Sequence, residues 1–303
     1  MKTCLLEEMT WPEIREAMDQ GFDTVIIYAA SIEQHGPALP ESTDLCLGYA
    51  EAADLAVRLG HALVAPVIRP GLSKHHMGFP GSVTLRPEVF RGVVEDYVAA
   101  YVHHGFRRII LGASHGGNFS AMDEIAAGLA RRYPDVCIVT GCCLDELDAS
   151  LIELEKMEGL PHGTCGGHAC DWETSIMMML DADRAAGGPG DAAGSADGSA
   201  IDGVGGAETG ADRTTGSAEY DALGFDNGMR VRADRLQTGF MGGLSGETLR
   251  VFFEEGVQAI SPIGVMGDPT GSNAGRGRRY FKYMQDVQET AVRKHIREWE
   301  MEH

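Results

Sequence analysis

The chain has 303 residues, and 45 Asp and Glu against 25 Lys and Arg give it a net charge of −20. A chain this acidic repels phosphate backbones and anionic lipids, so we expect no nucleic-acid partner and no membrane partner. The composition, with 44% apolar and 23% charged residues, is that of a globular protein and excludes a disordered one.

The sequence also predicts the compartment. No apolar run approaches the roughly 18 residues of a membrane span. The first residues, with Lys2, Glu7 and Glu8, do not form a signal peptide. The seven cysteines are an odd number without framework spacing. We therefore expect reduced thiols and a cytoplasmic protein.

Strands and helices alternate along the chain. After a helix that begins at Thr10-Trp11-Pro12, the pattern predicts strand 23–30, helix 45–59, strand 62–68, helix 87–104, strand 107–113, helix 119–133 and strand 136–140. Further on it predicts one or two strands around 229–235, helix 246–256 and a long amphipathic helix over 279–299. Strands separated by helices of this length indicate an α/β fold with a mainly parallel sheet, flanked by helices on both faces.

One stretch breaks this pattern. Residues 185–218 consist mostly of Gly, Ala and small polar residues, with Ile201 and Val204 as the only large aliphatics. Such a segment buries too little apolar surface to offset its ordering entropy. We expect a single domain over residues 1–303, with a low-complexity Gly/Ala/Asp-rich insertion at about 185–218.

Two polar loops follow predicted strands. Glu33, His35 and Asp44 come after the first strand, and His115 comes after the third strand, ahead of glycines. Ligands of open α/β sheets bind at the carboxyl ends of the strands, so we expect both loops at one edge. Carboxylates and imidazoles there suit a divalent metal ion such as Zn²⁺, Mn²⁺ or Fe²⁺. The alternatives are capping hydrogen bonds by Glu33 and His35, and a simple tight turn after His115.

A third polar segment runs from His168 to Ser175 into an apolar stretch. If a helix starts here, His168 and Glu173 lie within about one and a half turns of each other. Ionisable groups at the head of a buried helix are costly unless they are paired or bound to metal. Cys165 and Cys170 flank His168, but their spacing fits no standard zinc finger, so we interpret them as reduced thiols.

Five motifs occur in order along the chain, and together they resemble the creatininase family. They are Glu33-Gln34-His35-Gly36-Pro37 with Asp44, His76 with Phe79-Pro80-Gly81-Ser82, His115-Gly116-Gly117-Asn118, His168-Ala169-Cys170-Asp171-Trp172-Glu173-Thr174-Ser175, and Gly264-Val265-Met266-Gly267-Asp268-Pro269.

This resemblance implies a doubly wound fold, two divalent metal ions (Zn, Mn or Fe) and a homo-oligomer, of which a hexamer is one form. It implies the metal ligands Glu33, His35, Asp44 and His115, with Asp44 bridging. Creatininase has an acidic ligand where this chain has Gly117, so Glu173 is expected to complete the second metal site. The expected catalytic residues are His168 and Glu173. The expected substrate contacts are Ser73, His76, Gly116, Gly117 and Asn118.

The expected activity is hydrolysis of a small molecule, a cyclic amide or a formamide, by metal-activated water. One alternative keeps the metals and cleaves a C–C bond in a cyclic diketo sugar such as a dehydro-inosose. A second alternative is a metal-binding protein without turnover.

Overall fold

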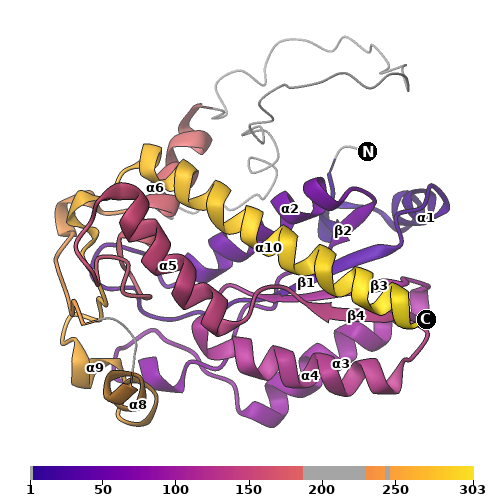
Figure 1. Cartoon of the computed structure of the whole chain (residues 1–303), viewed down its shortest axis with the longest axis horizontal. Helices are drawn as coiled ribbons and strands as arrows, with labels where there is room; N and C mark the ends of the chain where they lie inside the picture. The colour runs from indigo at the N-terminus through magenta and orange to yellow at the C-terminus, as the bar shows by residue number, and fades with distance from the viewer. Residues whose placement is uncertain (1–2, 187–229, 243–245) are drawn as a thin grey trace.

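The computed structural model describes residues 3–186, 230–242 and 246–303 (Figure 1). The insertion expected at about 185–218 therefore lies almost entirely outside the described residues. In the described part, no helix combines the length and the apolar character that crossing a membrane requires. All seven cysteines are free.

A parallel sheet forms the centre of the fold. Its four strands are β1 (Thr24–Ala29), β2 (Ala62–Val64), β3 (Arg108–Ala113) and β4 (Cys137–Thr140), in the order β2-β1-β3-β4. The chain builds outward from β1 to β2 on one side, then crosses back to β3 and β4 on the other. This confirms the doubly wound α/β fold and places its switch point between β1 and β3.

Helices cover both faces of the sheet. They are α1 (Trp11–Asp19), α2 (Thr43–Leu59), α3 (Pro87–His104), α4 (Phe119–Arg132), α5 (Leu144–Glu158), α6 (Asp171–Ala186), α8 (Gly246–Glu254), α9 (Val257–Ile260) and α10 (Ala274–Glu302). Alternate residues of β1 point to opposite faces. Val25 and Ile27 pack with Phe90 of α3 in one core, whereas Ile26 and Tyr28 pack with α2 and with Val292 of α10 in another.

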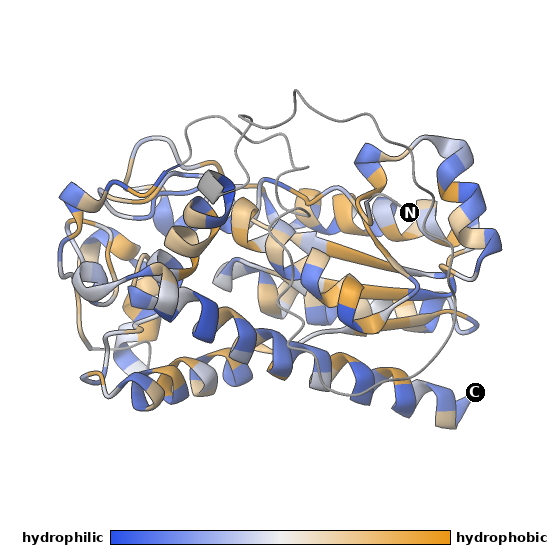
Figure 2. Cartoon of the chain, turned by 90° about the horizontal axis from the view of Figure 1, so that it is seen from above, coloured by the Kyte–Doolittle hydropathy of each residue, from blue (hydrophilic) through white to orange (hydrophobic). Residues whose placement is uncertain are grey.

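Local chemistry explains several helix ends. Thr10 caps α1 through a capping box, in which its backbone N–H donates to Glu13 at 2.7 Å. The α3 helix spans its predicted residues and ends at Gly105, whose φ of 102° is left-handed. Figure 2 shows apolar residues gathered on the strands and a polar outer face along the C-terminal helix α10, as expected for an amphipathic helix.

Two predictions of secondary structure were wrong, and one helix was missed. The strand expected over 62–68 ends at Val64, because Pro66 has no N–H for a continuous ladder. In place of a strand near 229–235, residues 233–235 form a 3₁₀ helix, and the Arg232 N–H donates to the Ala38 carbonyl rather than to a neighbouring strand. The α5 helix was not predicted at all, although its leucines recur at helical spacing.

A second core extends the fold beyond the carboxyl end of the sheet. There α5, α6 and α10 pack together around side chains that include Leu151, Ile176 and Phe281. The long α10 helix runs across both parts in Figure 1. It contacts α2 and β4 at the sheet and α6 in the second core. A cavity lies where these parts meet, lined by residues of α2, α5, α6, α8 and α10.

Candidate metal centre

The switch point of the sheet carries the predicted polar cluster. Glu33 and His35 follow β1, and His115 follows β3, which pairs with β1 in parallel register. Asp44 lies in the first turn of α2. The segment before α6 and its first turn add His168 and Glu173. All six residues are buried, with at most 4% of their surface exposed. The tertiary structure therefore brings the three predicted polar segments together.

The two carboxylate oxygens of Asp44 face different partners. Its Oδ1 lies 3.1 Å from Nε2 of His35, which in turn lies 3.8 Å from Oε1 of Glu173. Its Oδ2 lies 3.5 Å from Nδ1 of His115, which lies 3.1 Å from Oε1 of Glu33. Asp44 thus stands between two groups, each with one imidazole and one further carboxylate.

Backbone carbonyls orient the imidazoles of this cluster. Nδ1–H of His35 donates to the Glu33 carbonyl at 3.0 Å, and Nε2–H of His115 donates to the Leu72 carbonyl at 3.3 Å. Nε2–H of His168 donates to the Gln34 carbonyl at 2.7 Å. In its neutral form each ring carries one proton, so its other nitrogen then turns a lone pair toward the cluster. This is how metal-binding histidines are held. Without a cation, the neighbouring carboxylates outweigh burial and raise the pKa of His35 to about 10 and that of His115 to about 9.

Several buried atoms of the cluster lack hydrogen-bond partners among the described residues. They include both carboxylate oxygens of Glu33 and Oδ2 of Asp44. Buried, unpaired carboxylate oxygens are costly unless a cation or proton satisfies them. The described residues also contain three overlapping sets of possible metal ligands: Glu33 with His35 and Asp44, His35 with His168 and Glu173, and Glu33 with His76 and His168. The donor set therefore fits divalent cations.

Burial and neighbouring charges shift the pKa values of Glu33, Glu173 and His168 in different directions. Burial opposes ionisation of Glu33, but the charge of His115 outweighs it and holds the pKa of Glu33 well below its usual range. Burial raises the pKa of Glu173 to about 7. Burial, together with the charge of His35, holds the pKa of His168 well below its usual range. His168 is therefore a neutral imidazole, with the lone pair of Nδ1 toward the cluster.

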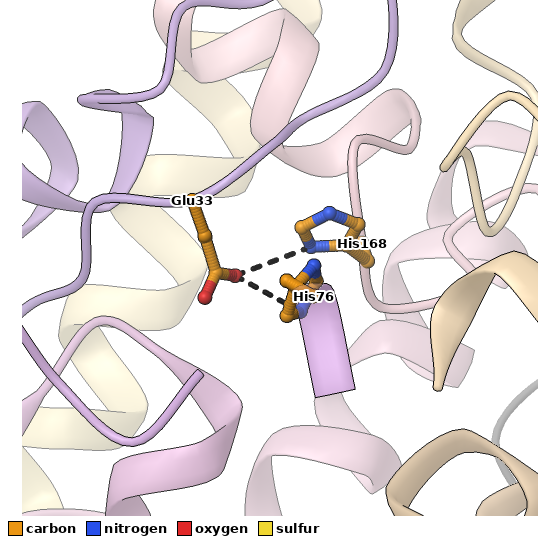
Figure 3. Close-up of side chains that lie close together, drawn as sticks. All are labelled: Glu33, His76 and His168. Atoms are coloured by element: carbon orange, nitrogen blue, oxygen red, sulfur yellow. Dashed lines mark ion pairs between the residues drawn. The ribbon is translucent and has the colours of Figure 1, made fainter. Parts of the chain in front are cut away.

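His76 reaches the cluster from the 3₁₀ helix Lys74–His76. Figure 3 shows His76 and His168 side by side, both facing the Glu33 carboxylate, whose Oε1 lies 3.2 Å from Nε2 of His76 and 3.8 Å from Nδ1 of His168. The amide nitrogen of Gln34 lies 3.0 Å from Nδ1 of His76 and 2.9 Å from Nε2 of His168. Because Nε2–H of His168 donates to the Gln34 carbonyl, the amide donates to His76 and not to His168. Gln34 lies between two predicted ligands but was not itself predicted to have a role in the site.

The other predicted substrate contacts differ in their surroundings, and not all of them line the cavity. Gly116 lines the cavity. Ser73 is fully buried against Ser31 and lies 3.4 Å from Nε2 of His115. The side chain of Asn118 bonds backbone groups at 29, 30 and 72, so it braces the loops. A Cβ at Gly117 would lie 2.6 Å from Nε2 of His115, which leaves no room there for an acidic side chain.

The cavity beside the cluster has walls that the sequence did not predict. An apolar wall comes from α8, where Phe252 and Phe253 contact His75 with ring centroids 4.7 and 5.1 Å apart. A polar wall comes from Glu51 of α2 and from Gln285 and Gln288 of α10. Burial, with the charges of Asp44 and Glu173, raises the pKa of Glu51 to about 8. No pattern around these residues marked them in the sequence.

The fold and this buried cluster of carboxylates and imidazoles define an α/β metal-dependent hydrolase. A family model described as "Creatininase: Creatinine amidohydrolase" matches residues 7–291. The chain therefore belongs to the creatininase family, as the motifs predicted.

Three known proteins illustrate this relationship. The 3-dehydro-scyllo-inosose hydrolase of Thermotoga maritima is 34% identical over 175 residues, which span 57% of this chain and only 55% of that protein. The mycofactocin precursor peptide peptidase of Mycolicibacterium smegmatis is 25% identical over 265 residues, 86% of this chain and 80% of that protein. The solved structure "Creatininase Mn" shares the fold, with a TM-score of 0.67 at 19% identity over 97% of this chain and 99% of that one.

Proposed function

We propose that this protein is a dinuclear hydrolase that cleaves the C–N bond of an amide in a small molecule. The observation that carries the proposal is the position of Asp44, whose two oxygens face separate imidazole–carboxylate pairs. One cation site then consists of Glu33, His115 and Oδ2 of Asp44. The other consists of His35, Glu173 and Oδ1 of Asp44.

Each remaining group has a role in this proposal. Divalent cations (Zn, Mn or Fe) held by these ligands would supply a water of lowered pKa and polarise a carbonyl. His168 accepts the proton from the attacking water through Nδ1 and returns it to the leaving nitrogen. Gly116, at the cavity wall, offers its backbone N–H to the carbonyl oxygen. Water and amide give a carboxylic acid and an amine.

His76 acts on the substrate side rather than as a metal ligand. Oε1 of Gln34 accepts from the Gly36 N–H at 2.9 Å, so the amide nitrogen is the atom that faces His76. Nδ1 of His76 therefore accepts, and its proton is on Nε2, which points to the cluster. A protonated nitrogen donates a hydrogen bond and cannot bind a cation.

The family model and one relative support the choice of an amide bond. The family model is described as creatinine amidohydrolase, and the mycobacterial relative that spans most of this chain is a peptide peptidase. A second candidate is hydrolysis of a C–C bond in a cyclic diketo sugar. It is favoured by the 34% identity to the inosose hydrolase, a higher identity than that of the peptidase.

Metal analysis combined with a substrate panel tests the proposal. Protein purified without added cations should hold two divalent ions per chain, and a chelator should abolish turnover until Zn²⁺, Mn²⁺ or Fe²⁺ is restored. The panel contains creatinine, formamides, short peptides and inositol-derived ketones. Turnover of the ketones alone would select C–C hydrolysis. One ion per chain and no turnover would leave a metal-binding protein.

The expected homo-oligomer and the cytoplasmic location are part of the same proposal. Sedimentation of the purified protein measures the number of subunits directly. A monomer at micromolar concentration would contradict the oligomer, which rests on the family alone.

A further inference from the structure

The polar wall of the cavity begins beyond Asp44 along α2. Glu51 lies seven residues after Asp44, which is about two helical turns and ~10 Å along the axis, on the same face of the helix. Gln285 and Gln288 are three residues apart and share a face of α10, which contacts α2. Two packed helices thus direct three polar side chains to one side of the cavity. We call this set, Glu51, Gln285 and Gln288, the polar arm.

Gln285 indicates that the polar arm binds a ligand. Its side chain lines the cavity and is only 1% exposed, and its Oε1 has no hydrogen-bond partner among the described residues. A buried amide oxygen without a donor costs free energy. No role in the fold accounts for this oxygen, so a donor that enters the cavity is the natural partner.

The other members of the polar arm are fixed from behind. The Gln288 amide N–H donates to the hydroxyl oxygen of Tyr28, and the Tyr28 O–H donates to Glu51. Tyr28 belongs to β1 and is fully buried. Gly141, just after β4, leaves room for Gln288, because a Cβ there would lie 2.7 Å from its Nε2. Glu51 and Gln288 are therefore held in place before any ligand arrives.

The charges of the cavity select the chemistry of that ligand. Glu51 and Oε1 of Gln285 are hydrogen-bond acceptors. The other charged side chains that line the cavity in the described structure are acidic or imidazole, without a Lys or Arg. Such a wall attracts hydrogen-bond donors and repels anions.

We infer that the polar arm binds the hydrogen-bond donors of the substrate, either hydroxyls or an ammonium group, while the scissile carbonyl lies at the metal centre. This inference rests on the proposed function and adds the substrate class: a small molecule with donor groups at the end away from the scissile bond. The apolar wall of Phe252 and Phe253 then contacts the carbon skeleton.

Calorimetric titration of the metal-loaded full-length protein tests this inference without requiring turnover. The probes are myo-inositol, which presents hydroxyls, 1,4-diaminobutane, which presents ammonium groups, and cyclohexanone, which has no donor. At least one donor probe should bind, and cyclohexanone should bind at least roughly tenfold more weakly. The probe that binds more tightly identifies the source of the donors.

Two variants and a matched control locate the binding. Gln285→Met removes the acceptor at constant length and should weaken the donor probe by roughly fivefold or more. Glu51→Gln removes the carboxyl group that can ionise beside an ammonium group, and should weaken the diamine by roughly tenfold or more and inositol by less. Glu16→Gln, the same change at an exposed position of α1, should leave the affinity unchanged.

The outcomes separate this inference from the proposed function. Failure of both donor probes to bind, or equal affinity in wild type and both variants, would overturn the polar arm even if the enzyme hydrolyses amides. Weakened binding in the variants together with no turnover on any substrate would instead leave the polar arm standing and overturn the hydrolase. If Glu51→Gln does not fold, as judged by thermal unfolding, Gln285→Met alone decides.

Discussion

The side-chain amide nitrogen of Gln34 lies 3.0 Å from Nδ1 of His76. The amide cannot rotate freely, because its oxygen accepts the Gly36 N–H at 2.9 Å. His76 therefore presents Nε2–H to the cluster, 3.2 Å from Oε1 of Glu33. The Gln34 side chain thus determines which nitrogen of His76 carries the proton.

Replacement of Gln34 tests this relationship. In Gln34→Met, His76 loses the donor that determines its tautomer, so kcat/KM should fall by roughly 10–100-fold. The metal content should stay at the wild-type value, because the Gln34 side chain is not one of the proposed metal ligands. Steady-state kinetics and elemental analysis measure the two quantities. Gln34→Glu, which also cannot donate, should resemble Gln34→Met, and wild-type activity in both variants would refute the role.

His168 is expected to transfer the proton. In His168→Asn, kcat should fall by roughly 10²–10⁴-fold, because no neutral imidazole faces the attacking water. Both cations should remain, since neither proposed metal site uses this ring. The measurement is kcat at saturating substrate with metal content determined on the same sample. Loss of a cation together with activity would show that His168 is a ligand instead.

Asp44 is expected to hold both cations. In Asp44→Asn, both metal sites lose charge and one shared ligand, so metal content should fall from two ions per chain to less than about one. In Glu173→Gln, only one site is affected, and about one ion should remain. Elemental analysis after equal dialysis compares the two variants. Equal metal content in both would mean that Asp44 is not shared.

Phe90 on α3 is expected to stabilise the core against the sheet. Its side chain is fully buried, so Phe90→Ala should lower the free energy of unfolding by about 3–5 kcal/mol. Trp11→Ala, at a side chain that is 79% exposed, should change it by less than about 0.5 kcal/mol. Denaturant titration measures both. A small effect of Phe90→Ala would show that the surrounding core side chains can fill the space that the phenyl ring leaves.

A charge pair between α5 and α10 predicts a pH-dependent contribution. Arg279 donates to both oxygens of Glu158, at 2.6 and 2.7 Å. These hydrogen bonds hold the pKa of Glu158 below its ordinary value of 4.5. A lowered folded-state pKa stabilises the protein above the unfolded pKa, and this stabilisation is lost as the pH falls through the folded value.

Glu158→Gln should therefore destabilise the protein at pH 7 but not at a pH well below 4.5. The effect should be no more than about 1 kcal/mol, because Arg279 is 54% exposed. Chemical denaturation at both pH values measures it. The double variant with Arg279→Met isolates the pair, and an effect that persists in acid would assign it to packing.

Most elements and most of the cluster were predictable because their signals are local. The Thr10 cap, the helix Pro87–His104 and the strand after Arg107 follow from caps, periodicity and buried runs. The interrupted strand after Val64 and the 3₁₀ helix at Ala233–Arg235 were not predictable in this way, because distant partners decide where their backbone hydrogen bonds go.

The amino-acid sequence by itself determined the parallel α/β pattern, the family and the residue types able to bind metal, since periodicity and side-chain chemistry lie within short segments. Only the tertiary structure decided that the oxygens of Asp44 divide between His35 and His115. It also placed Gln288 against Tyr28, 260 residues away. Such contacts depend on how the helices and strand ends pack in three dimensions, and no local sequence pattern specifies that packing.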